Sequence, residues 1–169
     1  MEIVELSPGD VRRLASDLAQ LLLDAHASNM ALGLAAPLDA ARARRAWLET
    51  AERLGPDRVL LAACEGPRVV GSVQLVRAAA ENGRHRGEIQ RLTVLRERRG
   101  EGLGRALLDA AAERARADGL SLLWLQTHAD TGADRFYEAT GWTRAGVIPS
   151  YAVRPDGTLS ANAFYFREL

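Results

Sequence analysis

The most informative stretch of this chain reads Arg98-Arg99-Gly100-Glu101-Gly102-Leu103-Gly104. Before it, residues 88–94 alternate roughly in polarity and are rich in β-forming residues, which predicts a strand. Apolar residues then recur at helical spacing over 103–111, which predicts an amphipathic helix. The glycines allow unusual φ values and a close approach to a ligand, and the first helical turn offers free N–H groups. The stretch therefore predicts a phosphate or pyrophosphate site, with charge added by Arg99 and Arg105.

The spacing of the glycines separates the known kinds of nucleotide site. A dinucleotide-binding fingerprint needs a third glycine three places after the second, and Arg105 stands there. A Walker-type loop needs Gly-Lys followed by Ser or Thr, which this stretch lacks. The remaining pattern, Arg99-x-x-Gly102-x-Gly104, resembles the acetyl-CoA signature of the GNAT N-acetyltransferase family. The alternative is a glycine-rich turn that binds no ligand.

Length and composition indicate one folded domain over residues 1–169. The 22 basic and 22 acidic residues cancel, so no nucleic-acid or membrane partner is expected. A single Cys excludes an internal disulfide and is typical of a reducing compartment. No signal peptide is apparent and no apolar run reaches the ~18–20 residues of a membrane span, so we expect a cytoplasmic protein.

The order of the expected elements predicts a mixed α/β (α+β) fold. We expect a first helix from an N-cap at Ser7 or Asp10 to about His26, and a third that starts at Leu103 and stops at Asp118-Gly119. The other elements are strands at 2–6, 58–64, 68–77, 88–94, 120–127, 142–147 and 162–167, and helices at 39–54 and 133–139. The whole order resembles the GNAT fold, which implies a mixed, mostly antiparallel sheet of about seven strands flanked by about four helices.

The resemblance also implies where acetyl-CoA, as co-substrate, would bind. In the family the end of the strand before the turn splays from its neighbour, so Leu92 and Val94 would offer backbone groups to the pantetheine arm. Asp130 occupies a position where many members carry an Asn that touches this arm. The implied cofactor-binding set is Leu92, Thr93, Val94, Arg99, Gly100, Gly102, Leu103, Gly104, Arg105 and Asp130.

Glu88 is the candidate general base. It lies 11 residues before Arg99, the spacing of the strand glutamate that acts as the base in the histone-acetylating branch. A primary amine has a pKa of ~10 and must lose a proton before it attacks, which a carboxylate of raised pKa can accept directly or through water. The alternative is that Glu88 is only an exposed residue of an alternating strand. His128, at the end of a strand, is an alternative base.

Tyr137 is the candidate general acid. The segment Phe136-Tyr137-Glu138-Ala139-Thr140-Gly141-Trp142 resembles the family's helix-turn-strand segment, in which a tyrosine hydroxyl points at the CoA sulfur. A thiolate of pKa ~8.5 needs only a hydrogen bond or a proton from tyrosine at ~10. The alternative is a core aromatic, as we expect for Phe136.

The expected substrate-binding residues are Gln90, Gln126, His128 and Asn29, the last from a loop over 27–37. The histidines lack metal-ligand spacing, so no metal site is expected. We expect Cys64 to be a small buried residue rather than a nucleophile. The sequence offers no suitably positioned nucleophilic side chain. Direct attack of the amine on acetyl-CoA in a ternary complex is therefore favoured over a covalent acetyl-enzyme.

A closer resemblance covers the last third of the chain. Segments 142–146, 148–152, 155–157 and 163–166 look like the tabtoxin-resistance type of acetyltransferase, as does 88–94. That branch acetylates the amine of a small amino-acid-like toxin. That branch carries acidic residues where this chain has Gln126 and His128. The resemblance therefore predicts the class of reaction but not the substrate.

Together these observations predict an acetyl-CoA-dependent N-acetyltransferase that acts on a primary amine of a small molecule, such as an amino-acid-like compound, toxin or antibiotic. The alternatives are a protein or peptide N-acetyltransferase and a non-catalytic acyl-CoA-binding regulatory domain. A homodimer remains open.

Overall fold

The computed structural model describes residues 1–30, 32–129 and 131–169. These residues form one seven-stranded sheet in the order β1-β2-β3-β4-β5-β7-β6. Every neighbouring pair is antiparallel except β4 with β5, which are parallel. The strands are β1 Glu2–Glu5, β2 Arg58–Glu65, β3 Arg68–Arg77, β4 Arg86–Val94, β5 Leu122–His128, β6 Thr143–Val153 and β7 Leu159–Glu168.

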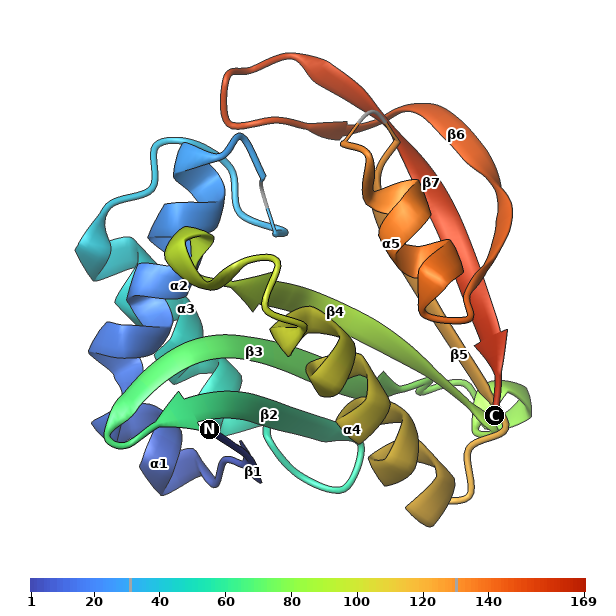
Figure 1. The fold of residues 1–169 in the computed structure, drawn as a ribbon, viewed down its shortest axis with the longest axis horizontal. Coiled ribbons are helices and arrows are strands. Elements are labelled where there is room, and N and C mark those ends of the chain that lie inside the picture. The colour runs from blue at the N-terminus through green and yellow to red at the C-terminus, as the bar shows by residue number, and fades with distance from the viewer. Residues whose placement is uncertain (31, 130) are drawn as a thin grey trace.

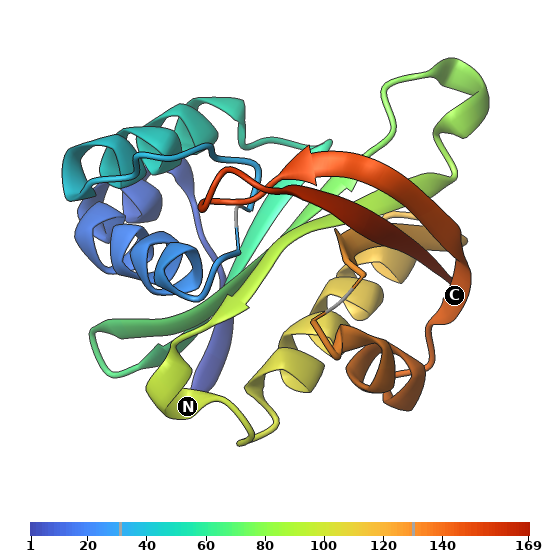
Figure 2. The ribbon, with the colours of Figure 1, turned by 90° about the horizontal axis from the view of Figure 1, so that it is seen from above.

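Helices cover both faces of this sheet (Figures 1 and 2). One face carries α1, α2 and α3, and the other carries α4 and α5. Short 3-10 turns, η1 and η2, flank β4. The bounds are α1 Pro8–Arg13, α2 Ala15–Ala27, α3 Ala40–Arg53, α4 Leu103–Ala117, α5 Ala133–Ala139, η1 Glu81–Gly83 and η2 Arg96–Arg98. None of the helices in the described residues is long and apolar enough to cross a membrane.

The core is mainly aliphatic, and the buried ring of Trp47 joins two of its helices. Leucine, valine and alanine side chains of β2, β3, α2 and α4 fill the space between the layers. Trp47 of α3 is fully buried, and its indole N–H donates to the carbonyl of Leu18 in α2 at 2.7 Å. Because this donor is satisfied, the large ring is buried at no polar cost and holds α3 against α2.

The fold class and the seven strands confirm the sequence prediction, with differences at some boundaries. The expected first helix is divided at Leu14, whose φ and ψ of −95° and 9° leave the helical region, so five α-helices replace about four. Ser7 and Asp10 form a reciprocal capping box that closes the separate helix α1.

The last two strands are longer than expected. β6 continues to Val153 although Pro149 and Ser150 interrupt its β-forming pattern. Both lie at a register shift in an exposed edge strand, where a missing N–H and a positive φ, +53° at Ser150, are tolerated. β7 accordingly starts at Leu159, which pairs with Val153.

Candidate active site

The centre of the sheet is split between β4 and β5. Their ladder contains only Arg86 with Leu122, Gly87 with Leu123 and Glu88 with Trp124. By contrast, β4 stays paired with β3 as far as Val94. Beyond Glu88 the two strands diverge (Figure 1), as the resemblance implied. β5 therefore leaves the backbone groups of residues 89–94 on this side to an extended ligand, except the Val94 carbonyl, which accepts from Arg99.

A bulge in β4 lies within this diverging segment. The β3–β4 register shifts there, and Arg91 adopts a φ of +50°. Its guanidinium turns toward the helices, where it donates to the Leu32 carbonyl at 3.2 Å and to the Thr50 hydroxyl at 3.3 Å. It also lies 5.7 Å from the centre of the Trp47 ring. Sequence analysis did not single out Arg91, because its alternating strand gives no signal of a bulge.

The glycine-rich turn has the conformation that its sequence predicts. Gly100 and Gly102 have φ values of +85° and +83°, in the left-handed region that favours glycine. Gly102 is the N-cap residue of α4 and offers no side chain to cap it. The first N–H groups of α4 thus face the turn with the positive end of the helix dipole. This geometry suits a phosphate or pyrophosphate group.

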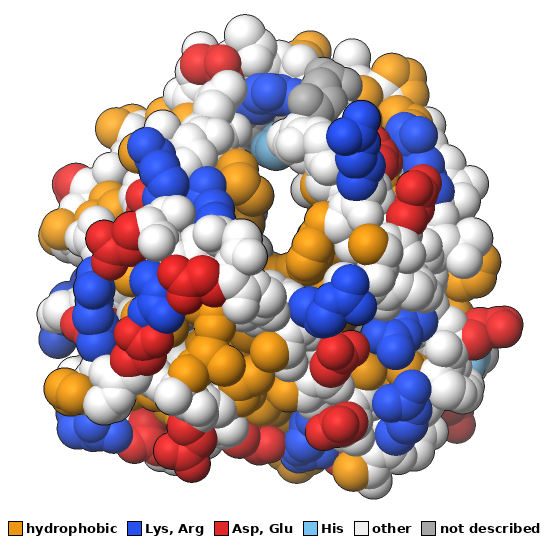
Figure 3. All heavy atoms as spheres, in the orientation of Figure 1, with side chains coloured by type: hydrophobic (Ala, Val, Ile, Leu, Met, Phe, Trp, Pro, Cys, Tyr) orange, Lys and Arg blue, Asp and Glu red, His pale blue; other side chains and the backbone are white. Residues whose placement is uncertain are grey.

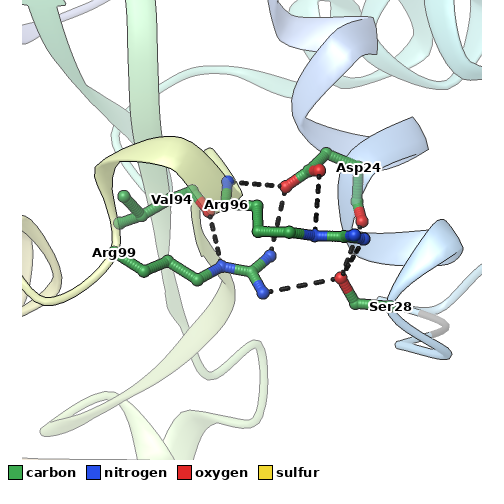
Figure 4. A network of polar contacts seen from close by, with 5 residues as sticks. All are labelled: Asp24, Ser28, Val94, Arg96 and Arg99. Carbon is green, nitrogen blue, oxygen red and sulfur yellow. Dashed lines mark hydrogen bonds and ion pairs between the residues drawn. The ribbon is translucent and has the colours of Figure 1, made fainter.

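Arg99 is bonded to the protein rather than directed freely at the turn (Figure 4). Its Nε donates to the Val94 carbonyl at 3.1 Å, and its guanidinium forms an ion pair with Asp24 of α2 at 3.2 Å. The backbone N–H of Arg96 donates to the same carboxylate at 2.8 Å. Arg96 and Arg99 also both reach the hydroxyl of Ser28. Asp24 was not singled out from the sequence; it ties the start of the turn to α2.

The other predicted residues of the turn divide between packing and backbone roles. Leu103 is buried in the core, so only its backbone can face a ligand. A Cβ on Gly104 would lie 3.2 Å from Phe136, so this glycine lets α5 pack closely on α4. Arg105 donates to the carbonyl of Ala139 at 2.7 Å and holds the end of α5. On β4, Thr93 is buried, while Leu92 and Val94 are half-buried at the split.

A cavity of about 550 Å³ opens beside the split. Figure 3, in the orientation of Figure 1, shows an opening in the middle of this face with apolar side chains on its rim. The cavity combines an apolar loop with polar residues from the two diverging strands and the last hairpin. Its lining is Met30, Leu32, Gly33, Leu34, Ala35, Glu88, Ile89, Gln90, Arg91, Gln126, Thr127, His128, Tyr151, Ala152, Val153 and Asn162.

Glu88 lies in this lining, at the point where the strands separate. Burial raises the pKa of its carboxyl group, while a hydrogen bond from Gln90 and the charge of Arg58 partly offset the rise. The Nε2 of Gln90 donates to Oε2 of Glu88 at 2.8 Å. Glu88 and Gln90 thus share one face of β4, as expected from their spacing.

The opposite wall brings Gln126 and His128 of β5 into the same cavity. The Oε1 of Gln126 accepts from Asn162 of β7 at 2.7 Å. The buried His128 places Nδ1 2.8 Å from the hydroxyl of Ser160. Asn162 was missed in the sequence, since only the β5–β7 register places it opposite His128.

Asn29 is not among the residues that line the cavity. Its side-chain amide donates to the carboxylate of Asp156 at 2.8 Å, and the Asp156 N–H donates back at 3.3 Å. These bonds join the end of α2 to the turn between β6 and β7. Asn29 thus connects the two segments that border the cavity, rather than presenting its amide to it.

Tyr137 is only 8% exposed and packs among aromatic rings. Its ring lies 5.0 Å from that of Tyr165, 5.2 Å from that of Phe136 and 6.2 Å from that of Trp142. Burial raises the pKa of its hydroxyl to about 12. Phe136, expected in the core, is partly buried against it. The catalytic role of Tyr137 stays a prediction.

A family model described as the acetyltransferase (GNAT) family matches residues 14–142, which span the split strands, the turn and α5. The chain belongs to this family. It is therefore an acetyl-CoA-dependent N-acetyltransferase.

Solved structures with the same fold extend over the whole chain. A ribosomal-protein-alanine N-acetyltransferase from Brucella melitensis is 23% identical, covers 100% of both chains and has a TM-score of 0.79. YncA from Salmonella typhimurium, solved with acetyl-CoA, is 20% identical over 99% of this chain and 93% of its own, with a TM-score of 0.78. A protein assigned as a phosphinothricin N-acetyltransferase is 18% identical over 99% and 98%, with a TM-score of 0.80.

The residues of this GNAT chain fit acetyl-CoA. The uncapped start of α4 and the left-handed Gly100 and Gly102 suit its pyrophosphate, and the unpaired edge of 89–94 suits its extended arm. Asp130 lies outside the described residues. Within the described ranges, no group of three or more His, Cys, Asp and Glu could hold a metal ion.

Proposed function

We propose that this acetyltransferase modifies the primary amine of a small molecule by direct attack within a ternary complex. The observation that carries the proposal is the position of Glu88. Its half-buried carboxylate lies in the wall of the cavity and at the end of the β4–β5 ladder, where cofactor and acceptor would meet. Acetyl-CoA, when bound, supplies an activated acetyl thioester.

Glu88 takes the proton of the acceptor amine. The amine binds as an ammonium with a pKa of ~10, and it attacks only after losing a proton. The raised pKa of Glu88 improves its match to this task, and Gln90 occupies one carboxylate oxygen. The Oε1 of Glu88 is then the atom that accepts the proton. His128 is the second candidate, although its Nδ1 already contacts Ser160.

Tyr137 acts as a hydrogen-bond donor to the departing thiolate. At a pKa of about 12 its hydroxyl is far less acidic than a thiol of pKa ~8.5, so complete proton transfer is unfavourable. A hydrogen bond to the developing negative charge needs no such transfer. The aromatic packing of the ring supports a fixed position for the donor.

The apolar side chains around the cavity favour an acceptor amine that carries an apolar group. Five of the six exposed large apolar side chains in the described residues belong to the β6–β7 hairpin, and two of them, Tyr151 and Val153, line the cavity. Leu32 and Leu34 lie in the facing loop. Exposed apolar side chains concentrated at one place favour an apolar ligand there. We therefore favour an amine with an alkyl or aryl body.

A protein N-terminus is the second candidate acceptor. The Brucella melitensis structure, named for a ribosomal protein alanine, matches along the full length of both chains. Such an acceptor would enter the same cavity with its first residues only. Both candidates need the same base and the same cofactor turn.

The test combines acetyl-CoA titration with thiol release from two acceptor panels. Acetyl-CoA at 100 times its dissociation constant should stabilise the fold by ~2.7 kcal/mol. We expect thiol release with small alkylamines and arylalkylamines and little with alanine-initiated peptides. Release with the peptides alone would favour the protein acceptor. Binding without release from either panel would favour the non-catalytic alternative and contradict our proposal.

A further inference from the structure

A network of hydrogen bonds connects Arg58 on β2, two strands away from β4, to the carboxylate of Glu88. Arg58 begins β2, and its Nη1 donates to Oε1 of Gln74 on β3 at 2.6 Å. The same Nη1 donates to Oε1 of Gln90 on β4 at 3.2 Å. Gln90 then donates from Nε2 to Oε2 of Glu88 at 2.8 Å. One cation thus touches both amides, and one of those amides touches the predicted base.

The chemistry of these groups fixes the orientation of the Gln90 amide. An arginine guanidinium has only donors, so it must face the amide oxygen. The amide nitrogen then faces Glu88, where it can donate to the carboxylate. If the amide turned over, its NH₂ would face the guanidinium and its oxygen would face the carboxylate. Both contacts would then be repulsive.

The Gln90 amide lies in partly buried surroundings, where a wrong orientation would cost more free energy than in water. Gln74 is fully buried, and Arg58, Gln90 and Glu88 are all half-buried. The register places Gln74 directly opposite Gln90, so the two amides lie side by side beneath the guanidinium. Hydrogen bonds in such partly dry surroundings are stronger than in water, and mismatched ones cost more.

We propose that Arg58 is a positioning residue, which holds the Gln90 amide so that its Nε2 donates to one oxygen of Glu88 and leaves the other for the acceptor amine. The consequence for catalysis rests on the proposed role of Glu88 as base. Arg58 does not line the cavity, so it acts through Gln90 rather than on the acceptor.

Other charged and titratable groups lie around this network of Arg58, Gln74, Gln90 and Glu88. They are Arg53 and Glu49 on α3, Arg91 on β4 and His128 on β5. Among the described residues, Arg58 is the charge that acts on the Glu88 carboxyl. Its effect has two separable parts, the direct attraction of the charge and the orientation of Gln90.

The relay from Arg58 through Gln90 to Glu88 predicts the direction in which the pKa of Glu88 should change in variants. The hydrogen bond from Gln90 lowers the pKa of Glu88 against the rise that burial causes. Arg58→Met and Gln90→Met should therefore each raise that pKa further. If Arg58 acts through Gln90, the pKa of Glu88 in the double variant should rise no further than in the more affected single variant. The reason is that both substitutions remove the same hydrogen bond, from Gln90 to Glu88.

The experiment follows the carboxyl carbons of ¹³C-labelled glutamate by NMR as pH is varied, with Glu88→Gln used to assign the Glu88 signal. Arg84→Met is the matched control, since Arg84 pairs with Asp57 at an exposed site away from the cavity. It should leave the Glu88 titration unchanged. An unchanged titration in Arg58→Met, or shifts that add in the double variant, would overturn the positioning role.

A second variant keeps the test decisive if Arg58→Met does not fold. Arg58→Lys retains the charge, but its shorter reach leaves the Gln90 amide free. We expect an upward shift of the Glu88 titration in this variant too. No shift would mean that charge alone suffices and would overturn the orienting role.

The titration also separates this inference from the proposed function, because it needs no turnover. Once an acceptor is known, the acidic limb of kcat/KM should move upward with the NMR titration. If Glu88→Gln retained full activity, Glu88 would not be the base. The NMR titration would still test whether Arg58 orients the Gln90 amide.

Discussion

The glycine-rich turn over 99–104, proposed to bind acetyl-CoA, and the cavity, proposed to bind the acceptor, are built in opposite ways. The turn is contiguous in sequence, and its shape comes from backbone angles at Gly100 and Gly102. The cavity is assembled from side chains of a loop, two diverging strands and the last hairpin. Its polar groups are held by other side chains: Glu88 by Gln90 of the same strand, and Gln126 of β5 by Asn162 of β7.

This difference separates a site that backbone groups can form from a site that needs specific side chains. A pyrophosphate can be bound by N–H groups that every residue carries, so the turn needs glycine rather than a special side chain. An acceptor amine must be distinguished from others, which requires side chains placed by the tertiary structure. Changes in the turn should affect acetyl-CoA alone, whereas changes in the cavity should affect the acceptor or the chemistry.

The largest effect should come from Glu88→Gln, which removes the base but keeps the shape. We expect kcat to fall about 100–1000-fold, in the range of general base catalysis, with unchanged acetyl-CoA affinity by calorimetry. Glu113→Gln, an exposed change on α4, is the control. A loss of less than ~5-fold would move the role of base to His128.

Tyr137→Phe should lower kcat by about 10–100-fold, with little change in the KM for acetyl-CoA. The ring and its packing remain, so thermal unfolding should stay close to that of the native protein. Equal activity in the two proteins would leave Tyr137 a core residue only.

Gly102→Ala tests the cofactor side directly. Its Cβ would meet nothing within 4 Å, so the cost is conformational, about 1–2 kcal/mol for a φ of +83°. We expect the KM for acetyl-CoA to rise about 5–30-fold, the equivalent of that energy.

Gly119→Ala is the matched control for this change. Gly119 follows the other end of α4, with a φ of +75° and the same open space. It should lose similar stability and leave the KM for acetyl-CoA unchanged. A rise in both variants would mean that strain alone affects binding and would separate Gly102 from the cofactor.

Asn29→Ala should act on the acceptor side with a smaller effect. It breaks an exposed contact with Asp156, so we expect stability to change by less than ~1 kcal/mol. The KM for the acceptor should rise about 2–5-fold because the two segments that border the cavity lose a contact that joins them, while the KM for acetyl-CoA stays constant. Asp156→Ala should match it, and the double variant should add nothing.

The smallest effect concerns stability and pH. Burial raises the folded-state pKa of Glu88 above its ordinary value of 4.5, so folding favours the protonated form. That contribution is fully present below pH 4.5 and is lost as pH rises through the folded-state pKa. Glu88→Gln should therefore unfold at a slightly higher temperature than the native protein at pH 7, with the difference vanishing near pH 4. An equal difference at both values would contradict the burial cost.

The sequence alone determined the features that depend on local chemistry. Gly100 and Gly102 predict left-handed positions whatever surrounds them, and strands 58–64 and 68–77 with the intervening turn follow from β-forming residues and Gly66. The two-residue spacing of Glu88 and Gln90 puts them on one face because side chains alternate along a strand.

Only the tertiary structure decided which distant residues meet. Arg58 lies 30 positions from Glu88 in the sequence, yet three antiparallel strands bring its guanidinium to Gln90. The engagement of Arg99 by Asp24 and the bulge at Arg91 likewise depend on helices packed against the sheet. A local pattern constrains only the backbone that carries it. Partners, burial and the pKa of Glu88 depend on register and packing, which arise when the whole chain folds.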